Sequence, residues 1–216
     1  MSREQILEKT IEFVKIKLDG DSSGHDWWHI YRVWNMSKRL QEKEGGNLFI
    51  IELAALLHDV ADWKFCEDEN AGLKVVKDWL NQFELPENII DQVIHIIKNV
   101  SYKGAGVKDQ MDLIEGEIVQ DADRLDAIGA IGVARTFAFG GKFGNEIYNP
   151  EINVQMHNNF TKYKNSKGTT VNHFYEKLLL LKDRMHTKYA KEIAIERHQF
   201  MELFLKQFYN EWKNLK

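Results

Sequence analysis

Apolar residues recur every three or four positions along most of this 216-residue chain, and prolines, which interrupt helices, occur only at Pro86 and Pro150. This spacing places apolar side chains on one face of an α-helix, and no stretch shows the alternation typical of a half-buried strand. We therefore predict an all-α fold, a helical bundle forming one domain over residues 1–216. The predicted helices span residues 3–18, 27–44, 48–60, 71–82, 87–100, 112–128 and a stretch to about 139, followed by two long helices within 171–212.

One segment departs from the helical pattern. Residues 140–169 are polar and rich in glycine and asparagine, and they carry the lysines Lys142, Lys162, Lys164 and Lys167. We predict an irregular insertion here. Its lysines suit a lid that closes over an anionic substrate, and they suit a solvated loop equally well, so both alternatives stay open.

Composition excludes several classes of protein. Hydrophobic residues make up 44% and charged residues 29%, which is ordinary for a soluble globular protein. The formal net charge of −4 provides no basic footprint for a nucleic-acid backbone. The single cysteine, Cys66, excludes an internal disulfide and fits a reducing compartment. No signal peptide or apolar run of transmembrane length is visible, so we expect a cytoplasmic protein that does not bind membranes. We also expect a monomer or homodimer that does not bind nucleic-acid polymers.

The segment LAALLHDVADWKF, residues 53–65, raises a question of burial. Its apolar run ends directly on His58 and Asp59, and Asp62 follows one turn later. Burying a polar group costs free energy unless the group is hydrogen-bonded, and burying a charge costs more unless it is paired or bound to a metal ion. These side chains therefore require a partner from elsewhere in the chain.

Two other predicted helices offer such partners. His29 lies in the largely apolar stretch GHDWWHIYRVWNMS, and Asp121, Asp123 and Asp126 interrupt the apolar helix EGEIVQDADRLDAIGAIG. His29 also fits a hydrogen-bonded core histidine, and the aspartates also fit an exposed acidic stripe. Asp123 and Asp126 are one turn apart and can share a face, whereas Asp121 points elsewhere. If the helices converge, two histidines and two carboxylates form a mixed nitrogen–oxygen site for a divalent metal ion.

The order of the histidines resembles the HD-domain superfamily of metal-dependent phosphohydrolases. His29, in the context HIYRV, matches the first histidine of those proteins. The adjacent pair His58-Asp59 matches the doublet that gives the superfamily its name. The likeness is strongest over residues 25–130.

The acidic helix extends this resemblance. Asp123, within ADRL, matches the distal aspartate, as in bifunctional (p)ppGpp hydrolases, and Asp121 is the alternative. Residues 173–205 resemble a small bacterial subgroup related to nucleoside triphosphate pyrophosphohydrolases. Members of the superfamily that bind two ions use additional histidines, and this chain offers only His95 on a plausible helix. We therefore expect one ion rather than two. The resemblance implies that this divalent ion, Mn²⁺ or Mg²⁺ in preference to Zn²⁺, Fe²⁺, Co²⁺ or Ni²⁺, is bound by His29, His58, Asp59 and Asp123.

One position departs from the family pattern. Several relatives carry glutamate three residues after the aspartate of the doublet, where this chain has the shorter Asp62. Asp62 is our candidate catalytic residue, because one turn past Asp59 its carboxylate would orient or deprotonate the attacking water. It also fits a helix cap or a surface aspartate.

Hydrolysis of a phosphate ester also requires cations that hold the phosphates of the substrate. The predicted contacts are Arg32, Lys64, Lys103, Arg124 and Lys177, together with His25, one turn before His29. We expect a nucleotide substrate, and the C-terminal resemblance favours cleavage of ribo- and deoxyribonucleoside triphosphates, (d)NTPs, to monophosphates and pyrophosphate. The alternatives are a nucleoside monophosphate phosphatase, a (p)ppGpp-type hydrolase, and a non-catalytic module that binds a nucleotide.

Overall fold

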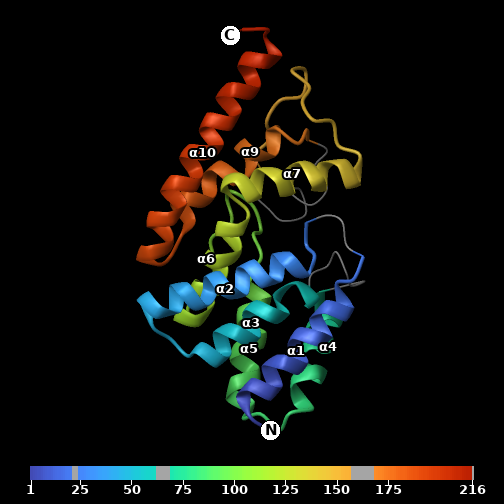
Figure 1. Cartoon of the computed structure of the whole chain (residues 1–216), viewed down its shortest axis with the longest axis vertical. Helices are drawn as coiled ribbons and strands as arrows, with labels where there is room; N and C mark the ends of the chain where they lie inside the picture. Colours follow the sequence, from blue (N-terminus) through green and yellow to red (C-terminus); the bar gives the residue numbers. More distant parts are fainter. Residues whose placement is uncertain (21–23, 62–68, 157–167, 216) are drawn as a thin grey trace. The chain divides into compact units, whose positions relative to one another are not determined.

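A computed structural model of the chain describes residues 1–20, 24–61, 69–156 and 168–215 (Figure 1). Within these ranges the chain forms helices and connecting loops but no β-strand, which confirms the all-α prediction. None of the helices in these ranges combines the length and the hydropathy that a transmembrane span requires. The elements are α1 (Arg3–Lys17), α2 (Trp27–Glu44), α3 (Leu48–Leu57), the 3₁₀ helix η1 (His58–Ala61), α4 (Glu69–Asn81), α5 (Glu87–Val100), α6 (Ile114–Asp126), α7 (Gly129–Phe143), α9 (Asn172–Glu176), the 3₁₀ helix η2 (Leu178–Arg184) and α10 (Lys188–Trp212).

Two regions differ from the predicted helices. The helix predicted over residues 48–60 changes to the 3₁₀ helix η1 at His58. The two long C-terminal helices are in fact one long helix, α10, preceded by the short α9 and by η2. The run LLLLKDR of η2 lacks the 3.6-residue period of an amphipathic α-helix. As a 3₁₀ helix, in which side chains three residues apart line up, it buries Leu178 and Leu181 together.

The described chain divides into two compact units. The first comprises Met1–Tyr102 and Lys108–Asp123, and the second comprises Lys103–Val107 and Arg124–Lys216. The boundary falls within α6, whose last three residues belong to the second unit. The single domain expected from the sequence remains a prediction.

The first unit is organised around α3. The sequence LFIIELAALL is apolar on almost every side, and a helix of that kind is stable only when neighbours cover it completely. Helices α1, α2 and α5 pack against it (Figure 1), and every residue from Phe49 to Leu57 except Glu52 is buried. Asn47 caps the helix, because its side chain accepts a hydrogen bond from Phe49 N at 3.2 Å. A central helix of this kind carries the residues that follow its last turn, His58 and Asp59, into the interior.

The second unit has an aromatic core. Helix α10 packs against α7 and η2, and α9 packs against η2. The ring of Phe204 on α10 lies 5.8 Å, between centroids, from both Phe137 on α7 and Phe174 on α9. Tyr148, after α7, packs edge-on against Trp212 at 4.9 Å. Aromatic pairs at such separations stabilise a fold beyond the area that they bury.

The described parts of the predicted insertion are attached to α9 and to the residues before it. Thr170 N donates to Glu146 O at 2.9 Å, and the buried carboxylate of Glu176 accepts a hydrogen bond from Gln155 N at 3.0 Å. Among the lysines of this insertion, Lys162, Lys164 and Lys167 lie outside the described residues. The choice between a lid and a solvated loop therefore stays open.

Two glycines of α7 provide a matched test of packing. A Cβ atom at Gly132 would lie 2.3 Å from Ala127 O, whereas one at Gly141 would meet nothing within 4 Å. We expect Gly132→Ala to lower the free energy of unfolding by about 1–3 kcal/mol, because the added methyl overpacks the turn between α6 and α7. Gly141→Ala should raise it by about 0.5–1 kcal/mol, since alanine is the better helix former. Urea unfolding measures both, and equal effects would contradict the close approach of α7 to Ala127.

Candidate metal centre

His58 is oriented by the helix that precedes it. It is the first residue of η1, and its Nδ1 lies 2.9 Å from Ala55 O in the last turn of α3. Because a carbonyl oxygen only accepts, Nδ1 carries the proton, and Nε2 of the neutral ring presents a lone pair. Such a hydrogen bond, which fixes both the tautomer and the orientation of the ring, is the usual arrangement for histidines that bind metal ions.

His29 presents its own Nε2 to the same point from α2. Asp26 caps this helix, because its Oδ1 accepts a hydrogen bond from His29 N at 3.0 Å. The cap places His29 in the first turn of α2, where its side chain is fully buried. His29 Nε2 lies 3.3 Å from His58 Nε2. Two ring nitrogens at this separation suit a hydrogen bond between the rings or two lone pairs directed at one cation.

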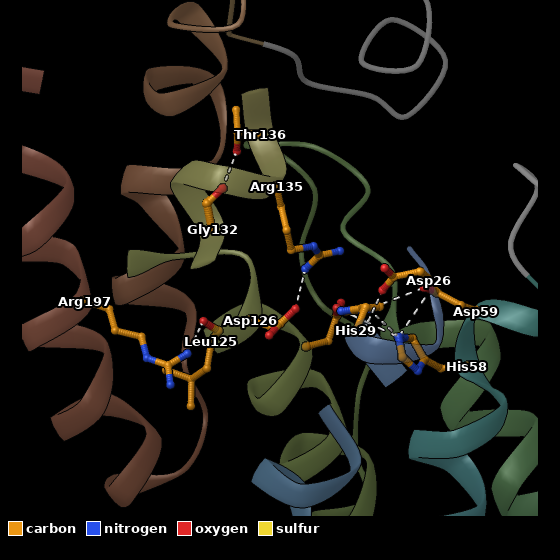
Figure 2. Close-up of polar contacts among 11 residues, drawn as sticks. Asp26, His29, His58, Asp59, Leu125, Asp126, Gly132, Arg135, Thr136 and Arg197 are labelled. Atoms are coloured by element: carbon orange, nitrogen blue, oxygen red, sulfur yellow. Dashed lines mark hydrogen bonds and ion pairs between the residues drawn. The ribbon is translucent and has the colours of Figure 1, made fainter. Parts of the chain in front are cut away.

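Two carboxylates complete the cluster. Asp59 Oδ2 lies 3.4 Å from His29 Nε2, and Asp59 Oδ1 lies 3.5 Å from His58 Nε2. Figure 2 shows these three side chains pointing toward one another. Asp123, on α6, places its Oδ1 3.4 Å from His29 Nε2 and 3.9 Å from His58 Nε2. The Asp59 side chain is 7% exposed and that of Asp123 is 29% exposed, so Asp123 is the more accessible of the two acidic members.

A divalent metal ion fits this arrangement. His29, His58 and Asp59 each offer a ligand atom, and these atoms lie within 4.8 Å of one another. Ligand atoms about 2.0–2.2 Å from one ion are roughly 3.3–3.6 Å apart in a tetrahedral arrangement. The two imidazole nitrogens, 3.3 Å apart, agree with that separation, and each of them lies 3.4–3.5 Å from one of the two Asp59 oxygens. A cation would also offset the cost of burying the charge of Asp59. Imidazole and carboxylate together suit several divalent ions, so the donor set indicates the class of ion.

Comparison with known proteins assigns this cluster to a family. The HD domain family matches residues 27–128, a range that contains all four residues of the cluster. An HD-superfamily hydrolase of known crystal structure, from Bacillus thuringiensis, is 50% identical, and the match covers 98% of this chain and 99% of that chain with a TM-score of 0.75. The chain belongs to the HD-domain superfamily. Membership and the His29–His58–Asp59 cluster together identify it as a metal-dependent hydrolase.

Two further relatives match nearly the whole chain. The Bacillus subtilis protein YpgQ is 41% identical over 201 residues, which is 93% of this chain and 90% of YpgQ. A crystal structure of YpgQ in complex with ADP has a TM-score of 0.75 at 38% identity and covers 95% of this chain and 97% of that chain. A crystal structure from Lactobacillus plantarum has a TM-score of 0.90 at 37% identity, covering 99% and 100%. The likeness therefore extends beyond the HD domain into the C-terminal helices.

The three aspartates of α6 have different surroundings in this HD-domain protein. Asp123 lies beside the two histidines, whereas Asp126, one turn later, is buried and pairs with Arg135 Nη1 at 2.8 Å (Figure 2). Asp121 is fully buried. The burial of Asp121 and Asp126 excludes the exposed acidic stripe considered from the sequence. The distances support Asp123 as the fourth ligand, and this assignment remains a prediction.

Two of the predicted substrate contacts lie near His29 in the chain. The His25 ring packs edge-on against the His29 ring, with centroids 5.7 Å apart. Arg32 lies on α2 one turn after His29 and is half-buried. Asp62, the predicted catalytic residue, and Lys64 lie outside the described residues. The roles of these residues remain predictions.

The remaining predicted contacts belong to the second unit. They are Lys103, Arg124 and Lys177. Arg124 is buried, and its Nη1 donates to Arg184 O and lies 3.3 Å from His186 Nε2. Arg124 therefore stabilises the end of η2, a structural role that the sequence did not reveal. A substrate contact by any of these residues also remains a prediction.

Two contacts that orient the histidines were not predicted from the sequence. Asp26 had a usable signal, because aspartate directly before an apolar helix is a frequent N-cap. The hydrogen bond from His58 to Ala55 O had no signal in the sequence, because every residue carries a carbonyl group and the residue type does not show which one a histidine will contact. His95, the further histidine considered for a second ion, instead pairs with Asp112 at 2.7 Å on the exposed surface.

Proposed function

We propose that this protein is a nucleotide phosphohydrolase that cleaves (d)NTPs to monophosphates and pyrophosphate. The observation that carries the proposal is the cluster of two buried imidazoles with the buried Asp59 and the partly exposed Asp123. Support for a nucleotide comes from YpgQ, which is 38% identical in its crystal structure with ADP. Cleavage between the α- and β-phosphates is inferred from the resemblance of residues 173–205 to nucleoside triphosphate pyrophosphohydrolases.

The residues of the cluster hold one divalent ion in this proposal, Mn²⁺ or Mg²⁺ by preference. Such an ion acidifies water and neutralises the charge that develops on phosphoryl oxygens. His58 is oriented by Ala55 O, and His29 is fixed in the first turn of α2, so their nitrogen atoms are held in position before an ion binds. Asp59 and Asp123 supply the negative charge that a divalent cation requires.

The remaining predicted residues act on the water and the substrate. The carboxylate of Asp62 accepts a proton from the attacking water. This role does not require Asp62 to bind the ion. Guanidinium and ammonium groups bind the polyphosphate and offset its charge, and His25 contacts the substrate. The proposed phosphate-binding residues are Arg32, Lys64, Lys103, Arg124 and Lys177. A reducing, cytoplasmic location and a monomeric or homodimeric state complete the proposal.

A product-release assay tests this function. The screen covers (d)NTPs, nucleoside diphosphates and monophosphates and (p)ppGpp, each with Mn²⁺, Mg²⁺, Co²⁺ and Zn²⁺. We expect triphosphates to have the highest kcat/KM and to yield pyrophosphate and monophosphate in equal amounts. EDTA should abolish turnover, because no side chain of the cluster replaces the charge of the ion.

Two outcomes of the same assay would contradict the proposal. Orthophosphate as the only product, with monophosphates as the best substrates, would replace it with a nucleoside monophosphate phosphatase. Nucleotide binding without turnover under every metal would favour the non-catalytic module.

A further inference from the structure

The last turn of α6 follows directly from a residue of the metal cluster. Helix α6 runs without interruption from Ile114 to Asp126, and Asp123 lies one turn before its end. The final residues of a helix lack intrahelical partners for their carbonyl groups and commonly fray. The position of the Asp123 carboxylate therefore depends on what holds the residues that follow it.

An ion pair holds the side chain of the last residue. Asp126 Oδ2 lies 2.8 Å from Arg135 Nη1, which comes from the second turn of α7 (Figure 2). The Asp126 side chain is 6% exposed and that of Arg135 is 14% exposed. A charge-assisted hydrogen bond removed from water to this degree is stronger than an exposed pair, because solvent screens it less.

A second arginine holds the backbone of the same turn. Arg197 on α10 donates its Nη1 to Leu125 O, a carbonyl that also accepts a bond from Ile128 N at 3.3 Å (Figure 2). A cation at the carboxyl end of a helix is favourable, since the helix dipole is negative there. The chain reverses direction at Gly129, whose φ of +76° favours glycine. The Arg197 side chain packs against this glycine, and a Cβ atom there would lie 3.0 Å from Arg197 Cγ.

We propose that Arg135 and Arg197 are positioning residues for the metal ligand Asp123. Leu125 and Asp126 follow Asp123 by two and three residues, so unwinding or rotation of this turn would break a buried contact before it moved the Asp123 carboxylate away from His29. The two arginines act through the helix and make no contact with substrate in this proposal. The inference rests on the proposed role of Asp123 as a ligand.

Calorimetric titration with Mn²⁺ alone, on the full-length protein without nucleotide, tests the proposal. Asp126→Ala/Arg135→Met removes both charges, so no buried charge is left without its partner. Arg197→Met removes the donor to Leu125 O and keeps the alkyl chain that packs on Gly129. We expect each variant to raise the Kd for Mn²⁺ about 10-fold, which lies in the range for groups that support a metal ligand without binding the metal.

Controls separate positioning from loss of folding. Thermal melts in EDTA should show that the variants are folded. If the double variant does not fold, Arg197→Met alone still tests the proposal. Arg39→Gln, an exposed arginine on α2, should leave the Kd unchanged. Wild-type affinity in folded positioning variants, with binding lost in Asp123→Ala, would overturn the positioning role alone. Unchanged binding in Asp123→Ala would instead overturn the ligand assignment on which the proposed function rests.

Discussion

Replacing His58 with alanine is expected to remove bound metal from the protein and to abolish hydrolysis. His58 Nε2 lies between 3.3 and 3.9 Å from donor atoms of His29, Asp59 and Asp123, so the substitution opens a gap at the centre of the ligand set. It also leaves the buried Asp59 without one of its two neighbouring imidazoles. We expect the affinity for Mn²⁺ to fall by more than about 100-fold, beyond the range for residues that only orient a ligand.

Metal content, kcat and the thermal midpoint, measured on one preparation, check this result. A ligand that binds only the folded state raises the midpoint, so the increase that Mn²⁺ produces in the wild-type protein should disappear in His58→Ala. His95→Ala is the matched control, because the His95 side chain is 40% exposed and pairs with Asp112. It should retain both metal and activity. Stoichiometric metal in His58→Ala would refute the assignment of the cluster.

The second large effect is expected from Asp62→Asn. The substitution keeps the size of the side chain and its hydrogen-bonding capacity but removes the basic oxygen. If Asp62 accepts the proton of the attacking water, kcat should fall about 10²–10⁴-fold, the contribution of a general base. Metal binding and the KM for nucleotide should change little, because in this proposal Asp62 acts on the water and does not bind the ion.

Three readouts distinguish the alternatives for Asp62. A helix cap would lose about 1 kcal/mol of stability on substitution and would leave catalysis largely intact. A metal ligand would lose bound metal together with rate. Asp91→Asn, at an exposed aspartate on α5, controls for the loss of one negative charge. A kcat for Asp62→Asn within a few-fold of the wild-type value would refute the catalytic role.

Local properties of the sequence were sufficient for the all-α fold. The recurrence of apolar residues every three or four positions is a property of each segment by itself, so it predicts a helix wherever that segment packs. The same local reasoning identified His58 and Asp59, because a polar pair at the end of an apolar run is costly to bury in any fold. With His29, they form the cluster that the structure contains.

The convergence of these residues was decided by the tertiary structure. His29 and His58 are 29 positions apart, and their nitrogens meet at 3.3 Å because α2 packs along α3. Sequence spacing carries no information about that packing, and only the resemblance to a known family suggested it in advance. The orientation of His58 likewise depends on the geometry with which η1 continues α3.

The partners of the buried charges and the positions at which helices end could not be predicted from the sequence either. The sequence allowed Asp126 either a place in an exposed acidic stripe or a face shared with Asp123, and it did not show that Arg135 on α7 would be its partner. Leu178–Arg184 was predicted as part of an α-helix but forms a 3₁₀ helix. The pattern of residues was enough to predict that the chain is helical and to show which buried residue types need a compensating partner. The tertiary structure decided which atoms compensate them, because an ion pair or a hydrogen bond between distant residues forms only where the packing of whole helices brings its two groups within about 3 Å.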